Sequence, residues 1–115
     1  MKNKLILALS GNDIFSGGGL HADLATYTVN GLHGFVAVTC LTAMTDKGFE
    51  VIPVEEEVFA QQLASLKDIS FSAIKIGLLP NLQIAEQALA FVKQHGDIPV
   101  VLDPCLLYTS DAADD

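Results

Sequence analysis

The chain has 115 residues, half of them hydrophobic, and a formal net charge of −8. This length suits a single domain, and the low charged fraction of 17% favours strands buried on both faces over a disordered chain. Acidic residues outnumber lysines and arginine is absent, which argues against binding to nucleic acid or to an anionic membrane.

The N-terminal part predicts a strand followed by a glycine-rich loop. Leu5–Leu9 is apolar but too short for a membrane span or a signal segment, so it predicts a buried strand. Residues 11–19 contain four glycines and lead into a helix, an arrangement that brings free backbone N–H groups close to a polar ligand. The loop matches neither a Walker A loop nor a dinucleotide fingerprint, and a merely flexible turn is the alternative.

A helix is predicted over residues 20–30. Leu20, Leu24, Tyr27 and Val29 fall near helical spacing, and Gly31 stands where a glycine commonly ends a helix.

The middle of the chain predicts two strands and a helix. Phe35–Cys40 is apolar and β-branched, as in a buried strand, and Phe49–Val54 suits a shorter strand that Pro53 confines to an edge. Glu55–Glu57 open a helix that extends to Asp68, because acidic residues suit the positive end of a helix dipole. A metal or partner site is the alternative for these glutamates. The apolar face of the helix consists of Val58, Phe59, Leu63 and Leu66.

The last part predicts a strand, a helix and another strand. Ser72–Leu78 is a strand, Asn81–His95 is an amphipathic helix with Asn81 as its N-cap and Gly96 as its stop, and Ile98–Leu102 is a strand. Strands that alternate with helices predict an α/β fold with a mostly parallel sheet flanked by helices. Ligands of such sheets bind beyond the carboxyl ends of the strands, here residues 11–19, 77–78 and 103–104.

Several of these segments resemble one enzyme family. Residues 8–24 are similar to the opening motif of the hydroxymethylpyrimidine/phosphomethylpyrimidine kinases and their pyridoxine-kinase relatives, approximately (A/S)G-x-D-x-S-G-G-A-G-(I/L)-x-A-D-L. Residues 36–48, VAVTCLTAMTDKG, resemble the second strand and substrate loop of that family. Lys75–Leu79 and Pro99–Pro104 resemble its K-I-G-M-L and V-V-L-D-P strand ends. The resemblance runs from about Leu5 to Pro104.

The resemblance implies a ribokinase-like fold and a kinase activity. The γ-phosphoryl group of ATP, with Mg²⁺, would pass to the hydroxymethyl group of pyridoxine or pyridoxal, or of hydroxymethylpyrimidine and its monophosphate, in vitamin B6 or thiamine metabolism. It implies a heterocycle site made by Gly11, Asp13, Gly18, Asp23, Met44, Gly77 and Leu78. It also implies that Asp103 lies near the phosphates and Mg²⁺, with no direct metal ligand in this chain.

Plainer interpretations stand beside these roles. Asp23 could be a helix residue that faces solvent, and Lys75 is expected to be a strand residue with an exposed ammonium group. The three histidines share no spacing, so we expect them at the surface or satisfied by neighbours: His21, His33 and His95. Cys40 and Cys105 lack metal-site or CxxC spacing, which predicts two reduced thiols in a cytoplasmic protein.

Two departures from the family pattern affect the expected substrate. The pyrimidine kinases have a glutamine where this chain has Met44, and a thioether cannot replace the hydrogen bonds of an amide to an aminopyrimidine edge. This favours pyridoxine or pyridoxal. Ile14 and Phe15 stand where the family usually has proline and serine, which enlarges the apolar side of the site.

The end of the chain departs from the family altogether. Residues 1–104 are interpreted as the N-terminal part of the kinase domain, and residues 105–115 as a non-native tail. The G-x-G-D motif, which carries the general base in this family, is absent from the sequence. We therefore expect no catalytic residue and no activity in the chain itself, whose full-length parent would be a homodimer. The alternative is a stand-alone α/β module that binds a heterocycle or nucleotide without catalysis. Genomic sequence beyond the Pro104 codon would discriminate between the two.

Overall fold

A computed structural model of the protein describes residues 4–15 and 18–103, and the predicted tail at 105–115 lies outside these ranges. In chain order the elements are β1 (Leu5–Ser10), α1 (Gly19–Val29), β2 (His33–Val38), β3 (Cys40–Thr45), β4 (Gly48–Pro53), α2 (Glu56–Leu66), β5 (Ala73–Ile76), α3 (Leu82–Gln94) and β6 (Val100–Leu102). No helix within the described ranges is long and apolar enough to cross a membrane.

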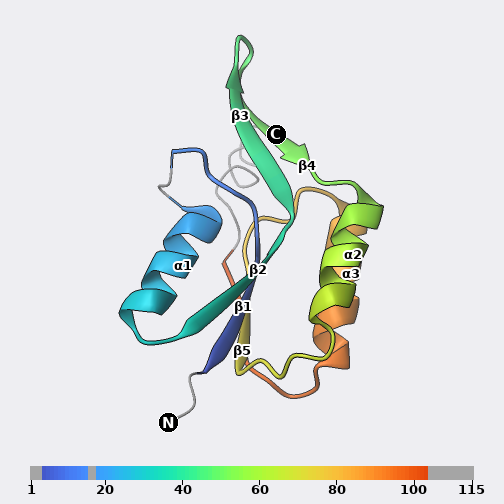
Figure 1. The fold of residues 1–115 in the computed structure, drawn as a ribbon. Coiled ribbons are helices and arrows are strands. Elements are labelled where there is room, and N and C mark those ends of the chain that lie inside the picture. Colours follow the sequence, from blue (N-terminus) through green and yellow to red (C-terminus); the bar gives the residue numbers. More distant parts are fainter. Residues whose placement is uncertain (1–3, 16–17, 104–115) are drawn as a thin grey trace.

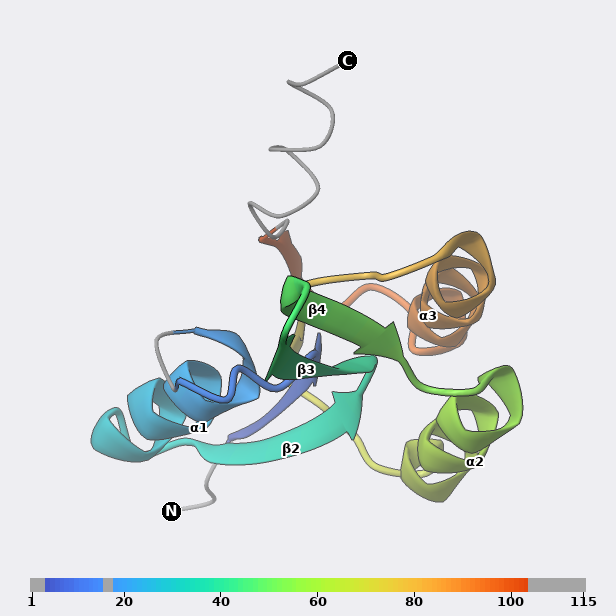
Figure 2. The ribbon, with the colours of Figure 1, turned by 90° about the horizontal axis from the view of Figure 1, so that it is seen from above.

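Four strands form a parallel sheet in the order β2-β1-β5-β6. Helix α1 covers one face of this sheet, and α2 and α3 lie side by side on the other (Figures 1 and 2). Parallel strands need such crossover connections, and the connecting helices bury both faces of the sheet. The predicted α/β class and the parallel sheet flanked by helices are confirmed.

The main core lies between the sheet and the α2–α3 layer. Alternate residues of β1 and β5 point into it, because successive side chains of a strand face opposite sides. The buried residues that these two strands contribute are Leu7, Leu9, Ile74 and Ile76. Those that the two helices contribute are Phe59, Leu63, Ile84, Ala88 and Phe91.

Helix α3 follows the local signals closely. The side chain of Asn81 accepts a hydrogen bond from the backbone N–H of Ile84 at 2.9 Å, which confirms the predicted N-cap. Past the end of the helix, Gly96 adopts a φ of 75°, a conformation that favours glycine. In α2 the predicted apolar face is only partly right, because Val58 is exposed while Phe59 and Leu63 are buried.

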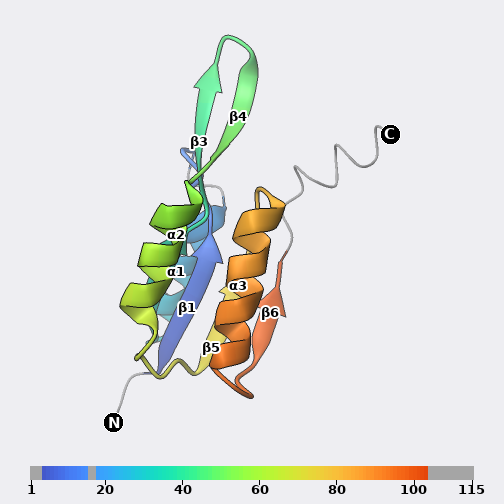
Figure 3. The same ribbon diagram turned by 90° about the vertical axis from the view of Figure 1, so that its right-hand side faces the viewer.

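The prediction that strands alternate with helices throughout is wrong between residues 39 and 54. The expected strand Phe35–Cys40 ends at Val38, and Cys40 begins a second strand that pairs antiparallel with β4. The two form a separate hairpin that rises beyond the carboxyl end of the parallel sheet (Figure 3). Gly48 closes its turn with a φ of 108°, so the Asp46-Lys47-Gly48 sequence carried an overlooked turn signal.

The predicted apolar face of α1 also needs correction. Val29 is 85% exposed, whereas the residue that this helix buries is Asp23, at 5% exposure. A buried carboxylate requires a partner, and Lys75 of β5 supplies it.

Candidate functional site

The carboxyl ends of the four parallel strands meet at one edge and are tied together by backbone hydrogen bonds. Thr39 N–H donates to the carbonyl of Ser10 at 2.9 Å, and Gly77 N–H donates to the carbonyl of Leu9 at 2.8 Å. Asp103 N–H donates to the carbonyl of Ile76 at 2.8 Å. The segments predicted to form the site, which are residues 11–19, 77–78 and 103–104, therefore begin at neighbouring strand ends.

Three glycines of the loop between β1 and α1 lie within the described residues, and each has a different environment. A Cβ atom at Gly11 would clash with the sulfur of the fully buried Cys40. Gly19 has a φ of 63°, and Leu20 N–H donates to the carbonyl of Gly11 at 3.0 Å. At Gly18 an added Cβ would meet, among the described residues, only an oxygen of Asp13 at the ordinary distance of 3.8 Å. Packing thus accounts for Gly11 and backbone conformation for Gly19, but neither accounts for Gly18.

The same loop holds the base of the hairpin. Asn12 N–H donates to the carbonyl of Cys40 at 3.1 Å, and its side-chain oxygen accepts from Thr42 N–H at 2.8 Å. Ile14 N–H donates to Oγ1 of Thr42 at 3.1 Å. Asp13, predicted at the heterocycle site, uses Oδ1 to accept from Phe15 N–H at 2.9 Å, so part of its role is to shape the loop.

Met44 lies on the hairpin, directly opposite Phe49 in the strand pairing, and is 56% exposed. Phe49 stacks on Phe15 of the glycine loop, with ring centroids 6.3 Å apart. The predicted substrate residue is therefore part of an exposed apolar surface that spans the loop and the hairpin. Phe49 was not predicted as a site residue, because the hairpin pairing that brings it beside Met44 was missed.

Gly77 and Leu78 lie where β5 leaves the sheet. A Cβ atom at Gly77 would approach Oγ of Ser10 to 2.8 Å, so glycine allows the two strand ends to pack closely. The carbonyl of Leu78 accepts a hydrogen bond from the buried hydroxyl of Thr39 at 2.7 Å. Thr39, which was not predicted as a site residue, thereby holds the backbone at this turn.

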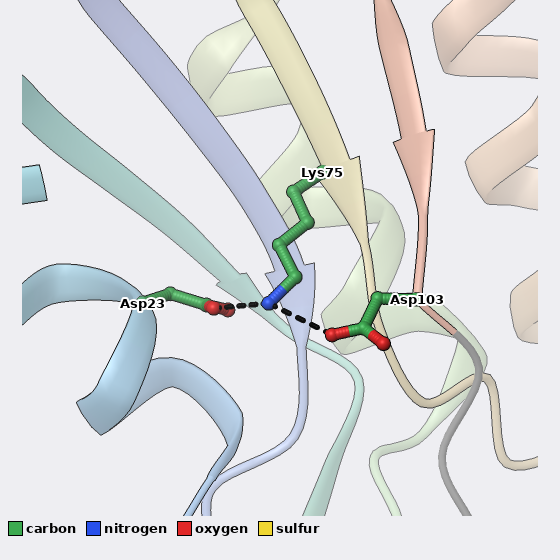
Figure 4. Close-up of polar contacts among 3 residues, drawn as sticks. All are labelled: Asp23, Lys75 and Asp103. Atoms are coloured by element: carbon green, nitrogen blue, oxygen red, sulfur yellow. Dashed lines mark hydrogen bonds and ion pairs between the residues drawn. The ribbon is translucent and has the colours of Figure 1, made fainter. Parts of the chain in front are cut away.

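An ion-paired group of three residues crosses the edge from α1 to β6 (Figure 4). The ammonium group of Lys75 hydrogen bonds to Oδ1 of Asp23 and lies 3.2 Å from Oδ2 of Asp103. The Asp23 side chain is 6% exposed, that of Lys75 26% and that of Asp103 65%. The expectation of an exposed Lys75 ammonium is wrong, because the group is ion-paired and partly buried, and so is the alternative that Asp23 faces solvent.

A signal for Lys75 was present in the sequence. It alternates with the buried residues Ile74 and Ile76, and its strand lies inside the sheet between β1 and β6. A lysine in an interior strand of a parallel sheet points into a covered face and therefore needs a carboxylate partner. Its register partner on the neighbouring strand β1 is Ala8, whose small side chain leaves room for the aliphatic part of the lysine.

These charges change the proton affinity of two groups. Partial burial tends to lower the pKa of Lys75, but hydrogen bonds and charge from Asp23 and then Asp103 outweigh it, and the pKa is raised. The pKa of Tyr27, one turn after Asp23 in α1, is raised by burial and by the Asp23 charge, with Lys75 acting in the opposite direction. Oδ2 of Asp23 and the hydroxyl of Tyr27 are buried without a hydrogen-bond partner in the described part of the chain.

The histidines and acidic residues outside this group show no common site. His21 and His33 are exposed, while Nδ1 of His95 lies 3.1 Å from the carbonyl of Phe91. Within residues 4–15 and 18–103, no three His, Cys, Asp or Glu side chains come close enough together to hold a metal ion.

Known proteins are similar to this chain in both sequence and fold. The family model described as phosphomethylpyrimidine kinase matches residues 13–113. The hydroxymethylpyrimidine/phosphomethylpyrimidine kinase of Haemophilus influenzae is 33% identical over 106 residues, and the pyridoxine kinase of Bacillus subtilis is 32% identical over 105 residues. These alignments cover 90% and 88% of this chain.

The fold has a solved counterpart in the pyridoxal kinase of Staphylococcus aureus in complex with AMP-PCP and pyridoxal. The TM-score is 0.82 at 30% sequence identity, over 89% of this chain and 39% of that one. The chain likewise spans 39% of the length of the two relatives above. Because the family model matches most of its residues, the chain belongs to the phosphomethylpyrimidine kinase family.

Proposed function

We propose that this chain is the substrate-binding part of an ATP-dependent kinase that phosphorylates the hydroxymethyl group of a small nitrogen heterocycle. The observation that carries the proposal is the buried carboxylate of Asp23, held by Lys75 beside the glycine loop at the edge of the sheet. Open α/β sheets bind their ligands at this edge. The relatives support it, because they are named as hydroxymethylpyrimidine/phosphomethylpyrimidine and pyridoxine kinases.

The heterocycle would lie between the glycine loop and the strand ends. Asp13 and Asp23 supply acceptors for its polar groups, and Gly18 allows a close approach of the ring. Gly11 keeps the loop packed against Cys40, and Gly77 and Leu78 lie beneath the ring. Gly18 supports this arrangement, since no described neighbour requires a glycine there. A residue without a side chain at such a point leaves room for a ligand.

Vitamin B6 compounds are the favoured substrates in this proposal. Met44, Phe49 and Phe15 present apolar and aromatic surface, which suits a ring but provides no amide to pair with an aminopyrimidine. The finer assignment is therefore pyridoxine or pyridoxal over hydroxymethylpyrimidine and its monophosphate.

Asp103 is the residue on the phosphate side. Its carboxylate is 65% exposed at the end of β6, and magnesium is commonly held by one or two carboxylates together with substrate phosphates. The donor chemistry therefore fits a role near Mg²⁺. When bound with ATP, the ion would neutralise charge on the phosphoryl group that is transferred. Lys75 would limit how far Asp103 can turn, because the two side chains are ion-paired.

The chain alone is expected to be inactive. Its sequence has no G-x-G-D motif, and phosphoryl transfer depends on several positioned groups acting at once. The base and most ATP contacts would come from the part of the relatives that this chain does not span. A cytoplasmic, homodimeric parent enzyme completes the proposal.

A fusion protein tests the function directly. Residues 1–103 would be joined to the C-terminal part of the Staphylococcus aureus pyridoxal kinase, starting after its matching strand, and assayed with ATP and pyridoxal. We expect phosphorylation of pyridoxal by the fusion and none by either part alone. A folded fusion that binds pyridoxal without transferring phosphate would instead support the non-catalytic module.

The substrate assignment is tested in the same fusion with Met44→Gln. We expect the wild type to prefer pyridoxal, and the variant to shift the kcat/KM ratio toward hydroxymethylpyrimidine by about 10- to 100-fold, as one or two hydrogen bonds would. Leu41→Gln, on the opposite face of the same strand, is the matched control and should leave the ratio unchanged. A wild type that turns over the pyrimidine faster would contradict the assignment.

A further inference from the structure

Lys75 is the residue that joins the two sides of the candidate site. It lies on β5 between Asp23 of α1 and Asp103 at the end of β6, so one ammonium group contacts the carboxylate proposed for the heterocycle and the one proposed for the phosphates.

The two contacts differ in environment. Asp23 is almost fully buried, so the Lys75 ammonium group is the main compensation for its lost contact with water. Asp103 is exposed and solvated, so its ion pair with Lys75 contributes little. Lys75 therefore serves mainly to hold Asp23, and its contact with Asp103 is the weaker of the two.

The two oxygens of Asp23 are used unequally. Oδ1 is engaged by Lys75, while Oδ2 is buried with no donor among the described residues. Buried carboxylate oxygens are nearly always hydrogen-bonded, so Oδ2 requires a donor from outside the described residues, and at the proposed site the substrate can supply it. The Asp23 side chain is only 6% exposed, so bulk water is a poor candidate for this donor.

We propose that Lys75 is a positioning residue: its ammonium group fixes Oδ1 of Asp23 and leaves Oδ2 to accept a hydrogen bond from a hydroxyl or amino group of the substrate. Only the identity of the ligand rests on the proposed function. The coupling between Lys75 and Asp23 is a property of the chain itself and can be measured without a ligand.

The first test is a double-mutant cycle on the 115-residue chain, followed by urea unfolding at neutral pH. The variants are Lys75→Met, Asp23→Asn and the two combined, with Lys67→Met on the opposite face of the sheet as the control for loss of a lysine. We expect Lys75→Met to lower the unfolding midpoint clearly in the wild-type background and much less in the Asp23→Asn background. Equal shifts in both backgrounds would overturn the proposal.

The second test uses the fusion kinase and separates positioning from simple stability. Lys75→Met should raise the KM for pyridoxal by about tenfold or more with a smaller effect on kcat, as expected when a contact to a charged acceptor is lost. Lys75→Arg, which keeps the charge, should recover most of the loss even if Lys75→Met folds poorly. Kinetics of Lys75→Met that match those of Lys67→Met, or no recovery with arginine, would overturn it.

The two tests distinguish the inference from the function on which it rests. A wild-type fusion that phosphorylates no heterocycle would remove the proposed function, while the cycle on the chain alone would still decide whether Lys75 holds Asp23. If ordered water rather than substrate satisfies Oδ2, the cycle would show coupling but the KM for pyridoxal would not move, and the proposal would fail.

Discussion

Helices α1 and α3 cover opposite faces of the same sheet, and different contacts hold them in place. Helix α3 has a side-chain N-cap and buries three apolar residues, Ile84, Ala88 and Phe91. Helix α1 begins at Gly19, its N-cap Gly18 makes no side-chain hydrogen bond, and the residue it buries is Asp23. One helix is held by packing against a core, whereas the other brings a charge to the strand edge. The difference separates what stabilises this fold from what builds its site.

The largest expected effect is on the α3 side. Phe91 is 4% exposed and packs in the core, so Phe91→Ala should lower the free energy of unfolding by about 3–5 kcal/mol through lost burial and the cavity left behind. Leu89→Ala on the same helix removes a side chain that is 53% exposed and should cost no more than about 0.5 kcal/mol. Urea unfolding of both variants gives the comparison. Similar losses in the two would mean that α3 is not docked as described.

A smaller loss is expected in the loop that precedes α1. Gly11→Ala places a methyl group against the sulfur of Cys40, and such overpacking costs about 1–3 kcal/mol. Gly18→Ala meets no close neighbour among the described residues and replaces a glycine N-cap, so it should cost no more than about 1 kcal/mol. Thermal unfolding would measure both. A greater cost at Gly18 than at Gly11 would contradict the assignment of Gly11 to packing and Gly18 to the site.

The N-cap provides a third test of the difference between the helices. Asn81→Ala removes the acceptor for Ile84 N–H and should cost about 0.5–2 kcal/mol. The matched change at the end of α1, Asn30→Ala, removes an exposed hydrogen bond to the carbonyl of Thr26 and should cost less than about 0.5 kcal/mol. Helix content by circular dichroism, followed through urea unfolding, reports both. Equal costs would mean that the two ends are held alike.

The smallest effect at neutral pH is expected at Tyr27. Its buried hydroxyl has no partner in the described part of the chain, so Tyr27→Phe should leave stability nearly unchanged at pH 7. The pKa of Tyr27 is raised above its ordinary value of 10.0, and that of Lys75 above 10.5. The folded chain therefore holds both protons more tightly than the unfolded chain.

The stability that these two groups contribute is fully present below pH 10. It is lost as the pH rises through the pKa values that the groups have in the folded chain. Tyr27→Phe should reduce the alkaline loss without abolishing it, because Lys75 still titrates. Unfolding midpoints measured between pH 8 and about 11.5 check this. An unchanged alkaline slope in the variant would show that Tyr27 is not buried beside Asp23.

The same contrast explains which parts of the fold could be predicted from sequence. Asn81, the apolar spacing of α3 and Gly96 are local signals, and they specified that helix without knowledge of its neighbours. The buried face of α1 depends on Lys75, which lies 52 residues further along the chain than Asp23. No pattern within the helix itself could reveal that partner.

Recognition of the candidate site was similarly divided. The family motifs identified residues at the carboxyl ends of the strands, and the structure brings Asp23 and Asp103 to one lysine there. Thr39 and Phe49 were missed, because their roles arise from strand pairing and from contacts across the sheet. Lys75 was missed although it alternates with the buried Ile74 and Ile76. Binding roles for Asp13, Gly18 and Met44 stay predictions, and Met44→Gln in the fusion kinase tests the last of them.

The hydrogen bonds between the glycine loop and the hairpin have a consequence for local opening. Asn12, Ile14 and Thr42 take part in them, so the loop cannot lift away without releasing the first residues of β3. In amide hydrogen exchange, the N–H groups of these residues should therefore become accessible in one cooperative event. Those in the middle of β1 should stay protected until the parallel sheet itself opens.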